Sequence, residues 1–224
     1  MTTKPTRKRV AVLISGRGSN MQALIAAARA PDYPAEIALV VSNRPEAAGL
    51  AIAAEAGIAQ LAIDHKHYAT RAAFEAKLHT ALLEARIDLI CNAGFMRLLT
   101  GGFVDRWYDR HLNIHPSLLP AFPGLETHQR ALDAGVTITG CTVHAIRVEM
   151  DSGPIIAQAA VAVMPGDTAD TLAARVLDAE HRLYPHALRL FASGAVRIEG
   201  ERAVFAPTVN QPSALFSPGL PPGR

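Results

Sequence analysis

The stretch Arg9-Val10-Ala11-Val12-Leu13-Ile14-Ser15-Gly16-Arg17-Gly18-Ser19-Asn20 decides the fold of this chain. Its first half is an apolar, β-branched run that is typical of a buried strand. Two glycines follow, and an alanine-rich helical pattern over residues 19–29 comes directly after them. A strand, a tight glycine turn and a helix make the first half of a βαβ unit, which predicts a parallel sheet.

The same alternation of strands and helices continues along the chain. We expect further strands at residues 36–43, 60–64, 89–93 and 112–115, and helices at 45–56, 70–86, 102–108 and 168–193. The strand at 89–93 is mostly apolar, so we expect it at the centre of the sheet.

Two long β-rich runs, residues 139–146 and 154–163, have only a loop between them, which indicates antiparallel pairing with Asp151 at the turn. The predicted fold is therefore a Rossmann-like open, mostly parallel sheet. It has helices on both faces and an antiparallel extension toward the C-terminus. Residues 196–205, interrupted by Gly200, predict a closing hairpin.

The domain prediction is a disordered leader at residues 1–8, a single domain at 9–205 and a loose proline-rich tail at 206–224. The net charge of +2, from 22 basic and 20 acidic side chains, argues against a nucleic-acid partner. No apolar run has the roughly 18 residues of a membrane span, so we expect no membrane partner. Cys91 and Cys141 lack paired spacing, which favours reduced thiols and a cytoplasmic location.

The glycine loop predicts an anion site, because glycines let backbone N–H groups at a helix start approach a phosphate. A dinucleotide fingerprint needs a third glycine where Met21 stands, and an acid where Ser42 and Asn43 end the second strand. NAD binding is therefore disfavoured. The alternative is a glycine turn that serves only tight packing.

Asn113 and His115 lie two residues apart in a predicted strand, so their side chains point to the same side. An amide N–H and an imidazolium N–H on one side can hold a single oxygen atom that develops negative charge. A carboxylate from Asp151 favours the charged imidazole, although aspartate is also a common turn residue.

Three other histidines are given less weight. His144 lies inside a β run and is interpreted as support for the sheet. His65 and His67 can share a face, but no third ligand has a useful spacing, so we expect no metal.

Four segments resemble the folate-dependent formyltransferase family, which moves a formyl group from 10-formyltetrahydrofolate to an amine. They are Asn-x-His-x-Ser-Leu-Leu-Pro at 113–120, Ile-Ser-Gly-Arg-Gly-Ser-Asn at 14–20, Ala-Gly-Phe-Met-Arg-Leu-Leu at 93–99 and Ala-Glu-His at 179–181. Their order and spacing match the family from Val10 to about Val204. The resemblance implies 5-phosphoribosylglycinamide as the acceptor, in purine (IMP) biosynthesis.

The resemblance also implies a role for each matched residue. The catalytic residues would be Asn113, His115 and Asp151. The acceptor's ribose phosphate would be held by Gly18, Ser19 and Asn20, and its amine would be received by Glu180. The pteridine of the donor would be bound by Met96, Arg97, Leu98 and Leu99 together with Asn113, and Arg71 would lie near the folate tail. The loop at 147–151 would form the opposite wall, and the Leu119-Pro120 bond would be cis.

Three other functions share parts of this pattern. A 10-formyltetrahydrofolate hydrolase would use water in place of the amine, and a tRNA formyltransferase would need a second, basic domain. The third is a folate- or nucleotide-binding module without activity. The sequence leaves a monomer and a homodimer equally open.

Overall fold

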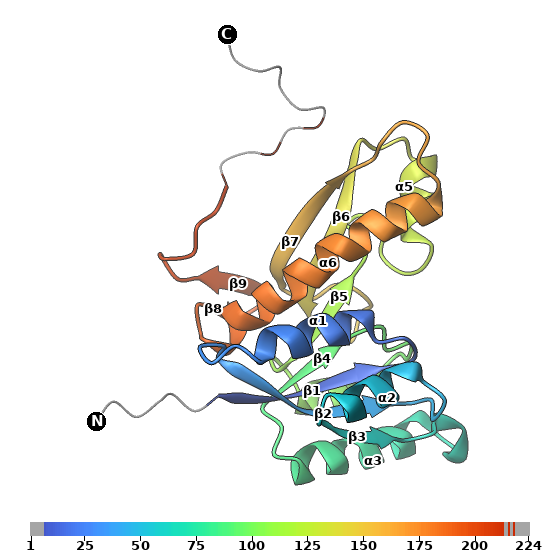
Figure 1. Cartoon of the computed structure of the whole chain (residues 1–224), viewed down its shortest axis with the longest axis vertical. Coiled ribbons are helices and arrows are strands. Elements are labelled where there is room, and N and C mark those ends of the chain that lie inside the picture. Colours follow the sequence, from blue (N-terminus) through green and yellow to red (C-terminus); the bar gives the residue numbers. More distant parts are fainter. Residues whose placement is uncertain (1–6, 213–214, 216, 218–224) are drawn as a thin grey trace.

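A seven-stranded sheet in the order β3-β2-β1-β4-β5-β6-β7 forms the centre of the protein (Figure 1). The computed structural model describes residues 7–212, 215 and 217. The parallel strands are β1 (Lys8–Ile14), β2 (Ala35–Ser42), β3 (Ala59–Ala62), β4 (Leu89–Asn92) and β5 (His111–His115). Strand β6 (Ile138–Ala145) is antiparallel to β5, and β7 (Ile155–Ala162) is antiparallel to β6. The predicted fold class is confirmed, and β4 is the central strand as expected.

Helices cover both faces of the sheet (Figure 1). One face packs against α1 (Ser19–Ala28), α2 (Ala48–Glu55) and α6 (Ala169–Ala192), and the other against α3 (Arg71–Glu84) and α4 (Gly101–Arg106). The short α5 (Thr127–Asp133) packs beside α6. This is the layering that buried parallel strands require.

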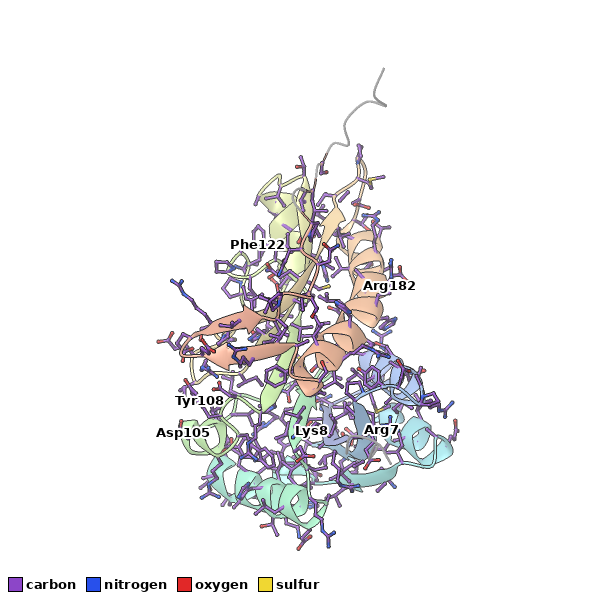
Figure 2. The ribbon with its side chains drawn as sticks, turned by 90° about the vertical axis from the view of Figure 1, so that its left-hand side faces the viewer. Arg7, Lys8, Asp105, Tyr108, Phe122 and Arg182 are labelled. Carbon is purple, nitrogen blue, oxygen red and sulfur yellow. The ribbon has the colours of Figure 1, made fainter. Side chains whose placement is uncertain are left out.

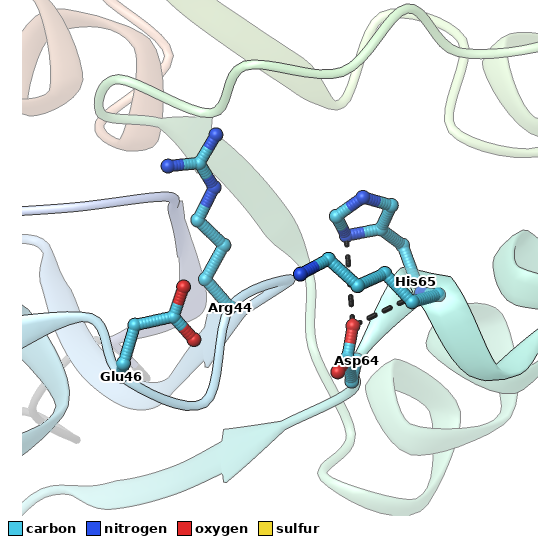
Figure 3. A pocket seen from close by; sticks show the side chains of 5 residues that line it. Arg44, Glu46, Asp64 and His65 are labelled. Carbon is cyan, nitrogen blue, oxygen red and sulfur yellow. Dashed lines mark hydrogen bonds and ion pairs between the residues drawn. The ribbon is translucent and has the colours of Figure 1, made fainter.

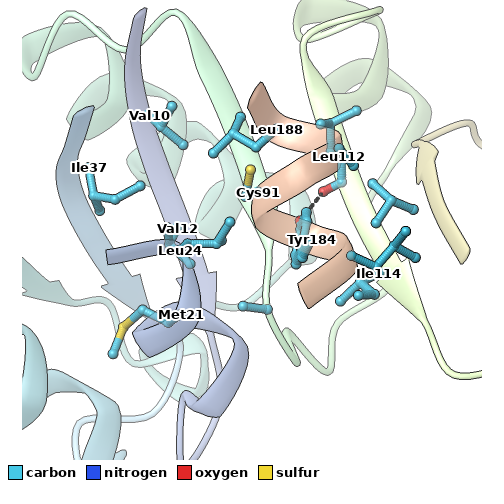
Figure 4. Packing of buried hydrophobic residues seen from close by; sticks show 14 of the residues in the cluster. Val10, Val12, Met21, Leu24, Ile37, Cys91, Leu112, Ile114, Tyr184 and Leu188 are labelled. Atoms are coloured by element: carbon cyan, nitrogen blue, oxygen red, sulfur yellow. Dashed lines mark hydrogen bonds between the residues drawn. The ribbon is translucent and has the colours of Figure 1, made fainter. Parts of the chain in front are cut away.

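Strand β1 supplies both halves of the core, because successive side chains point to opposite faces. Val10, Val12 and Ile14 pack with α1 and α6, whereas Ala11 and Leu13 pack with α3 and α4. Figure 4 shows the first of these clusters around Tyr184. The buried Tyr184 hydroxyl donates hydrogen bonds to the carbonyls of Asn92 at 2.9 Å and Leu112 at 3.2 Å. It thereby fixes α6 against β4 and β5.

The predicted C-terminal hairpin is present as β8 (Val196–Glu199) and β9 (Arg202–Phe205), with Gly200 in the left-handed region at the turn. Lys8 already belongs to β1. The predicted leader and tail lie largely outside the described residues, so the domain boundaries remain predictions.

Two short elements were not expected, and one helix begins late. The 3-10 helix η1 (His65–His67) is too short for a periodic pattern, and a proline-rich segment at residues 116–123 precedes α5. Helix α2 begins at Ala48 rather than Pro45. Gly49 packs against the glycine loop, donating its N–H to the Gly16 carbonyl at 3.1 Å, and this tertiary contact fixes the start of the helix.

Candidate functional site

The site lies where the order of the sheet reverses. The chain builds outward from β1 to β3 and then returns to place β4 on the other side of β1. Open α/β sheets bind ligands at the carboxyl ends of the strands beside such a switch point. Ser15–Gly18 follows β1 and Met96–Leu99 follows β4, so two predicted binding segments meet at this edge.

The glycine loop has the geometry of an anion site. Gly18 has a φ of 74° and caps α1 without a side-chain hydrogen bond, which leaves the N–H groups of the first turn available to a ligand. A side chain at Gly18 would be strained in this conformation, and its Cβ would lie 3.3 Å from the Gly49 backbone. The packing interpretation and the anion interpretation of this glycine are therefore compatible.

Two polar side chains hold the loop in place. The Ser15 hydroxyl donates to Asn43 Oδ1 at 2.5 Å and accepts from the Met96 N–H at 2.8 Å. The Asn43 carbonyl in turn accepts from His65 Nδ1 at 2.9 Å. These bonds connect the ends of β1, β2 and β4 into one rigid edge.

His65 also lines a cavity of about 280 Å³ with Arg44, Glu46, Asp64 and Lys66 (Figure 3). Its walls carry both signs of charge, and the Asp64 carboxylate is satisfied locally by the Lys66 N–H. None of the residues predicted to bind substrate lines this cavity.

Asn20 and Glu180 meet at the start of α1, although 160 positions separate them in the sequence. Asn20 Nδ2 donates to Glu180 Oε2 at 2.6 Å, and both side chains are buried. Burial raises the pKa of Glu180 to about 7, against the opposing effect of the Asn20 hydrogen bond. Asn20 Oδ1 is buried and has no hydrogen-bond partner among the described residues. The pair therefore offers unsatisfied acceptor capacity to an N–H donor.

We expect Glu180→Gln to become more stable relative to the wild type as the pH rises. The folded state binds the Glu180 proton more tightly than the unfolded chain, so wild-type stability falls between the unfolded pKa of about 4.5 and the folded pKa of about 7. Glutamine does not titrate, so the free energy of unfolding of the variant does not fall in this way. For the wild type the fall amounts to roughly 2 kcal/mol between pH 5 and pH 8. Denaturant unfolding at both pH values measures it.

Glu199→Gln is the matched control, because Glu199 is exposed in the C-terminal hairpin. A Glu180→Gln variant whose stability difference from the wild type is the same at pH 5 and pH 8 would contradict the assignment.

Four polar side chains gather at the carboxyl end of β5. Asn113 and His115 lie on the same side of β5, and Asn113 is paired with His144 across the antiparallel ladder. His115 Nδ1 lies 3.4 Å from Asp151 Oδ2, and His144 Nε2 lies 3.8 Å from Asp151 Oδ1. Asn113 Nδ2 lies 3.2 Å from His144 Nε2. The three residues predicted to be catalytic are thus brought together, with His144 between Asn113 and Asp151.

His115 lies between a backbone carbonyl and a carboxylate. Its Nε2 donates to the Phe122 carbonyl at 3.0 Å, while its Nδ1 faces the Asp151 carboxylate. Phe122, whose φ is 52°, belongs to the proline-rich loop that covers β5, and the sequence did not mark its carbonyl as part of the site.

Asp151 both forms a turn and faces the histidines. Its φ of 56° places it in the left-handed region, which aspartate tolerates better than most residues. Its Oδ2 accepts from the Gly124 N–H at 2.8 Å. The turn is tight, because a Cβ at Gly153 would lie 1.8 Å from the Ala145 carbonyl oxygen.

His144 is the residue that sequence reasoning placed outside the site. Burial lowers its pKa, and neighbouring His115 lowers it further, against the Ala145 carbonyl and Asp151, which raise it. Its Nδ1 donates to the Ala145 carbonyl at 3.0 Å, which leaves Nε2 to accept from Asn113. His144 and Thr142 are two residues apart in β6, so the sequence indicates that their side chains share one face of the strand. Only the register of β5 with β6 shows that Asn113 lies on the same face.

The loops after β4 and β6 both expose apolar side chains at the edge of the sheet. The exposed fractions are 62% for Met96, 59% for Leu98, 62% for Val148 and 59% for Met150. A Cβ at Gly101 would lie 3.6 Å from the Val148 side chain, so the loop after β6 reaches the start of α4. A flat, mostly apolar ligand between these loops would cover side chains that otherwise face water.

The other predicted positions are placed as follows. The buried Arg97 Nε has no hydrogen-bond partner among the described residues, and Leu99 packs against the core on the α3 face. Arg71 opens α3 and is exposed, and within the described structure no hydrogen bond or ion pair joins it to the other candidates. The Leu119-Pro120 bond is cis, as the resemblance implied.

Residues 7–212, 215 and 217 contain no group of three or more His, Cys, Asp and Glu side chains that could hold a metal ion. None of their helices combines the length and hydrophobicity needed to cross a bilayer.

An anion-type loop at a switch point, next to a histidine–carboxylate pair, is the arrangement of an α/β enzyme that works at the carboxyl edge of its sheet. The chain belongs to the formyl transferase family, which it matches over residues 8–188.

Known proteins with similar sequences and structures support this membership. The phosphoribosylglycinamide formyltransferase of Escherichia coli is 41% identical over 87% of this chain and 92% of its own length. A glycinamide ribonucleotide transformylase 1 from Symbiobacterium toebii has a TM-score of 0.89 at 47% identity, covering 92% of this chain and 97% of its own. The trifunctional purine biosynthetic protein adenosine-3 of Bos taurus is 53% identical over 88% of this chain, which spans only 20% of that protein.

Proposed function

We propose that this chain transfers the formyl group of 10-formyltetrahydrofolate to the amine of 5-phosphoribosylglycinamide, in purine (IMP) biosynthesis. The observation that carries the proposal is the His115–Asp151 contact beside Asn113, at the same sheet edge as the glycine loop. The similarity to enzymes named for this reaction supports the choice of substrates.

The acceptor would bind across the start of α1. Backbone N–H groups at Gly18, Ser19 and Asn20 would hold its phosphate. Its amine would donate to Glu180 and to the unpartnered Asn20 Oδ1. A carboxyl with a pKa of about 7 can take up an amine proton near neutral pH, and the amine must lose its charge before it attacks.

The donor would bind between the two exposed apolar loops. Met96, Arg97, Leu98 and Leu99 form one wall for the pteridine ring, and residues 147–151 form the other. Arg71 would lie near the folate tail, which extends toward α3. This placement would bring the formyl group to Asn113 and His115.

The reaction then needs no covalent intermediate with the enzyme. The amine nitrogen attacks the formyl carbon, and the electron pair of the carbonyl moves onto its oxygen. Asn113 and the His115 imidazolium stabilise this oxyanion, which would compete with the Phe122 carbonyl for the His115 proton. Collapse breaks the bond to N10 of the folate, which gains a proton as the amine nitrogen loses one. Binding both substrates side by side supplies the proximity.

The test is incubation of the chain with 10-formyltetrahydrofolate, with and without phosphoribosylglycinamide, while the donor is followed. We expect donor loss only when the acceptor is present, with equal amounts of formylated product. Donor loss that is the same without acceptor would contradict the proposal and support a hydrolase. Protection against thermal unfolding by phosphoribosylglycinamide is an independent check of acceptor binding.

A monomer and a homodimer both fit this function, and no metal or nucleic acid enters it. A cytoplasmic location remains a prediction.

A further inference from the structure

Arg147 lies in the loop between β6 and β7, outside the histidine cluster, and several polar contacts hold its side chain. Its Nη2 lies 2.8 Å from Asp109 Oδ1, and its Nε lies 2.9 Å from Glu201 Oε2. Its side chain is only 10% exposed, and its Nη1 also donates to the Ile146 carbonyl at 3.1 Å. The guanidinium therefore joins three separate parts of the chain: the segment before β5, the loop after β6 and the turn of the C-terminal hairpin.

Tyr108 completes this group. The Arg147 guanidinium carbon lies 3.9 Å from the centre of the Tyr108 ring, a distance at which a cation is attracted to an aromatic face. The Tyr108 hydroxyl donates to Glu201 Oε1 at 2.5 Å. Figure 2 shows Tyr108 next to the hairpin of β8 and β9. Glu201 Oε1 thus accepts from Tyr108 and from Arg147 Nε at 3.2 Å, while Oε2 accepts from Arg147 Nε at 2.9 Å.

The charges within this group support one another. Burial alone would lower the pKa of Arg147, but the hydrogen bonds to Glu201 and Asp109 outweigh burial and raise it. The hydrogen bonds from Tyr108 and Arg147 lower the pKa of Glu201. The guanidinium is largely buried and pairs with two different carboxylates at once, so its planar group is held from two sides.

The rest of the loop is held mainly at its other end. Asp151 is fixed by the Gly124 N–H and by the histidines. Between the two ends, Val148, Glu149 and Met150 are exposed, and the Ser152 hydroxyl bonds to the Glu149 carbonyl within the loop itself. The position of Val148 and Met150 therefore depends on the anchors at Arg147 and Asp151.

We propose that Arg147, Asp109, Tyr108 and Glu201 form an anchor through which the C-terminal hairpin positions the 147–151 loop for binding of the folate donor. This inference rests on the proposed function, which places the donor against that loop. Arg147 is a positioning residue, because it acts through the loop and does not touch the reacting atoms. The hairpin thereby gains a role in donor binding, although it lies outside the formyl transferase match at residues 8–188.

The test compares Arg147→Met and Glu201→Gln with a control in the same hairpin, Glu199→Gln. Glu199 pairs with Arg197 at 2.6 Å, and both side chains are more than half exposed. We expect Arg147→Met to raise the KM for 10-formyltetrahydrofolate by about tenfold and Glu201→Gln by about threefold. The KM for phosphoribosylglycinamide should change by less than about twofold, because the acceptor site at α1 does not contact this group. The control should match the wild type in both constants.

A conservative variant and a double variant sharpen the result. Arg147→Lys keeps the charge but cannot pair with two carboxylates through a planar fork, so we expect its donor KM to lie between the wild type and Arg147→Met. The double variant Arg147→Met/Glu201→Gln should be no worse than Arg147→Met alone, because both changes remove the same contact.

Amide hydrogen exchange separates failure of this inference from failure of the proposed function. Without any ligand, amides 148–151 should exchange faster in Arg147→Met and Glu201→Gln than in the wild type, while those of β1 and β4 stay unchanged. Exchange and donor KM that both match the Glu199→Gln control would overturn the anchor. A wild type without transferase activity would instead overturn the proposed function, and the exchange measurement would still decide whether the anchor orders the loop.

Discussion

Replacement of His115 with alanine is expected to lower kcat by about 10²-fold or more. The imidazole lies at the end of β5, with Asp151 on one side and the Phe122 carbonyl on the other. Alanine removes the proton that would stabilise the oxyanion and leaves Asn113 as the remaining proposed donor. Steady-state kinetics with both substrates varied gives kcat and both KM values.

The KM for phosphoribosylglycinamide should stay within about threefold of the wild type, because the proposed phosphate site is formed by Gly18, Ser19 and Asn20 and does not include His115. His67→Ala is the control, because the His67 side chain is 80% exposed in a different part of the chain. A His115→Ala enzyme with wild-type turnover would end the proposed mechanism. A raised KM with unchanged kcat would instead indicate that His115 binds substrate and does not act in catalysis.

Asp151→Asn is expected to lower kcat by about 10²-fold as well. Asparagine has nearly the same size, tolerates the left-handed backbone at this turn and can still accept the Gly124 N–H. The substitution therefore removes the negative charge beside His115 and His144 while it preserves the turn. Kinetic measurement across a range of pH shows whether the loss follows the charge state of the cluster.

Asp170→Asn is the matched control, because it makes the same substitution at an exposed aspartate in the first turn of α6, outside the candidate site. It should leave kcat unchanged. If Asp151→Asn retains wild-type kcat, the carboxylate serves only to form the turn, which is the simpler interpretation of this residue.

Much of the fold could be predicted from local patterns. The apolar run at 89–93 was placed at the centre of the sheet, and the two adjacent β runs were placed in an antiparallel extension; the structure confirms both. These predictions hold because a strand buried on both faces has a nearly continuous apolar sequence, and two strands joined by a short loop pair in an antiparallel manner. Helix α5 and η1 were missed. Three residues are too few to establish a period for η1, and α5 closely follows prolines at 116, 120 and 123, which favour a loop.

The candidate site could be predicted only in part. Strand alternation places Asn113 and His115 on one side, and the register of β5 with β6 confirms it. The same register brings in His144, which no local pattern could assign, because the pairing of two strands depends on the loop between them. The contact between Asn20 and Glu180 could not be derived locally either, since the two residues meet only after α1 and α6 pack on the same face.

By itself, the sequence determined which chemical groups this protein can present: a glycine loop open to an anion, an amide and an imidazole on one strand face, and an acid at a turn. Alternation, glycine conformation and helix starts are local properties, so they can be recognised before the chain is folded. Only the tertiary structure decided which of these groups meet. It placed His144 between Asn113 and Asp151, buried Glu180 against Asn20, and brought the C-terminal hairpin to Arg147. These contacts join residues far apart in sequence, and they depend on how helices and strands pack against a shared core, which no local pattern specifies.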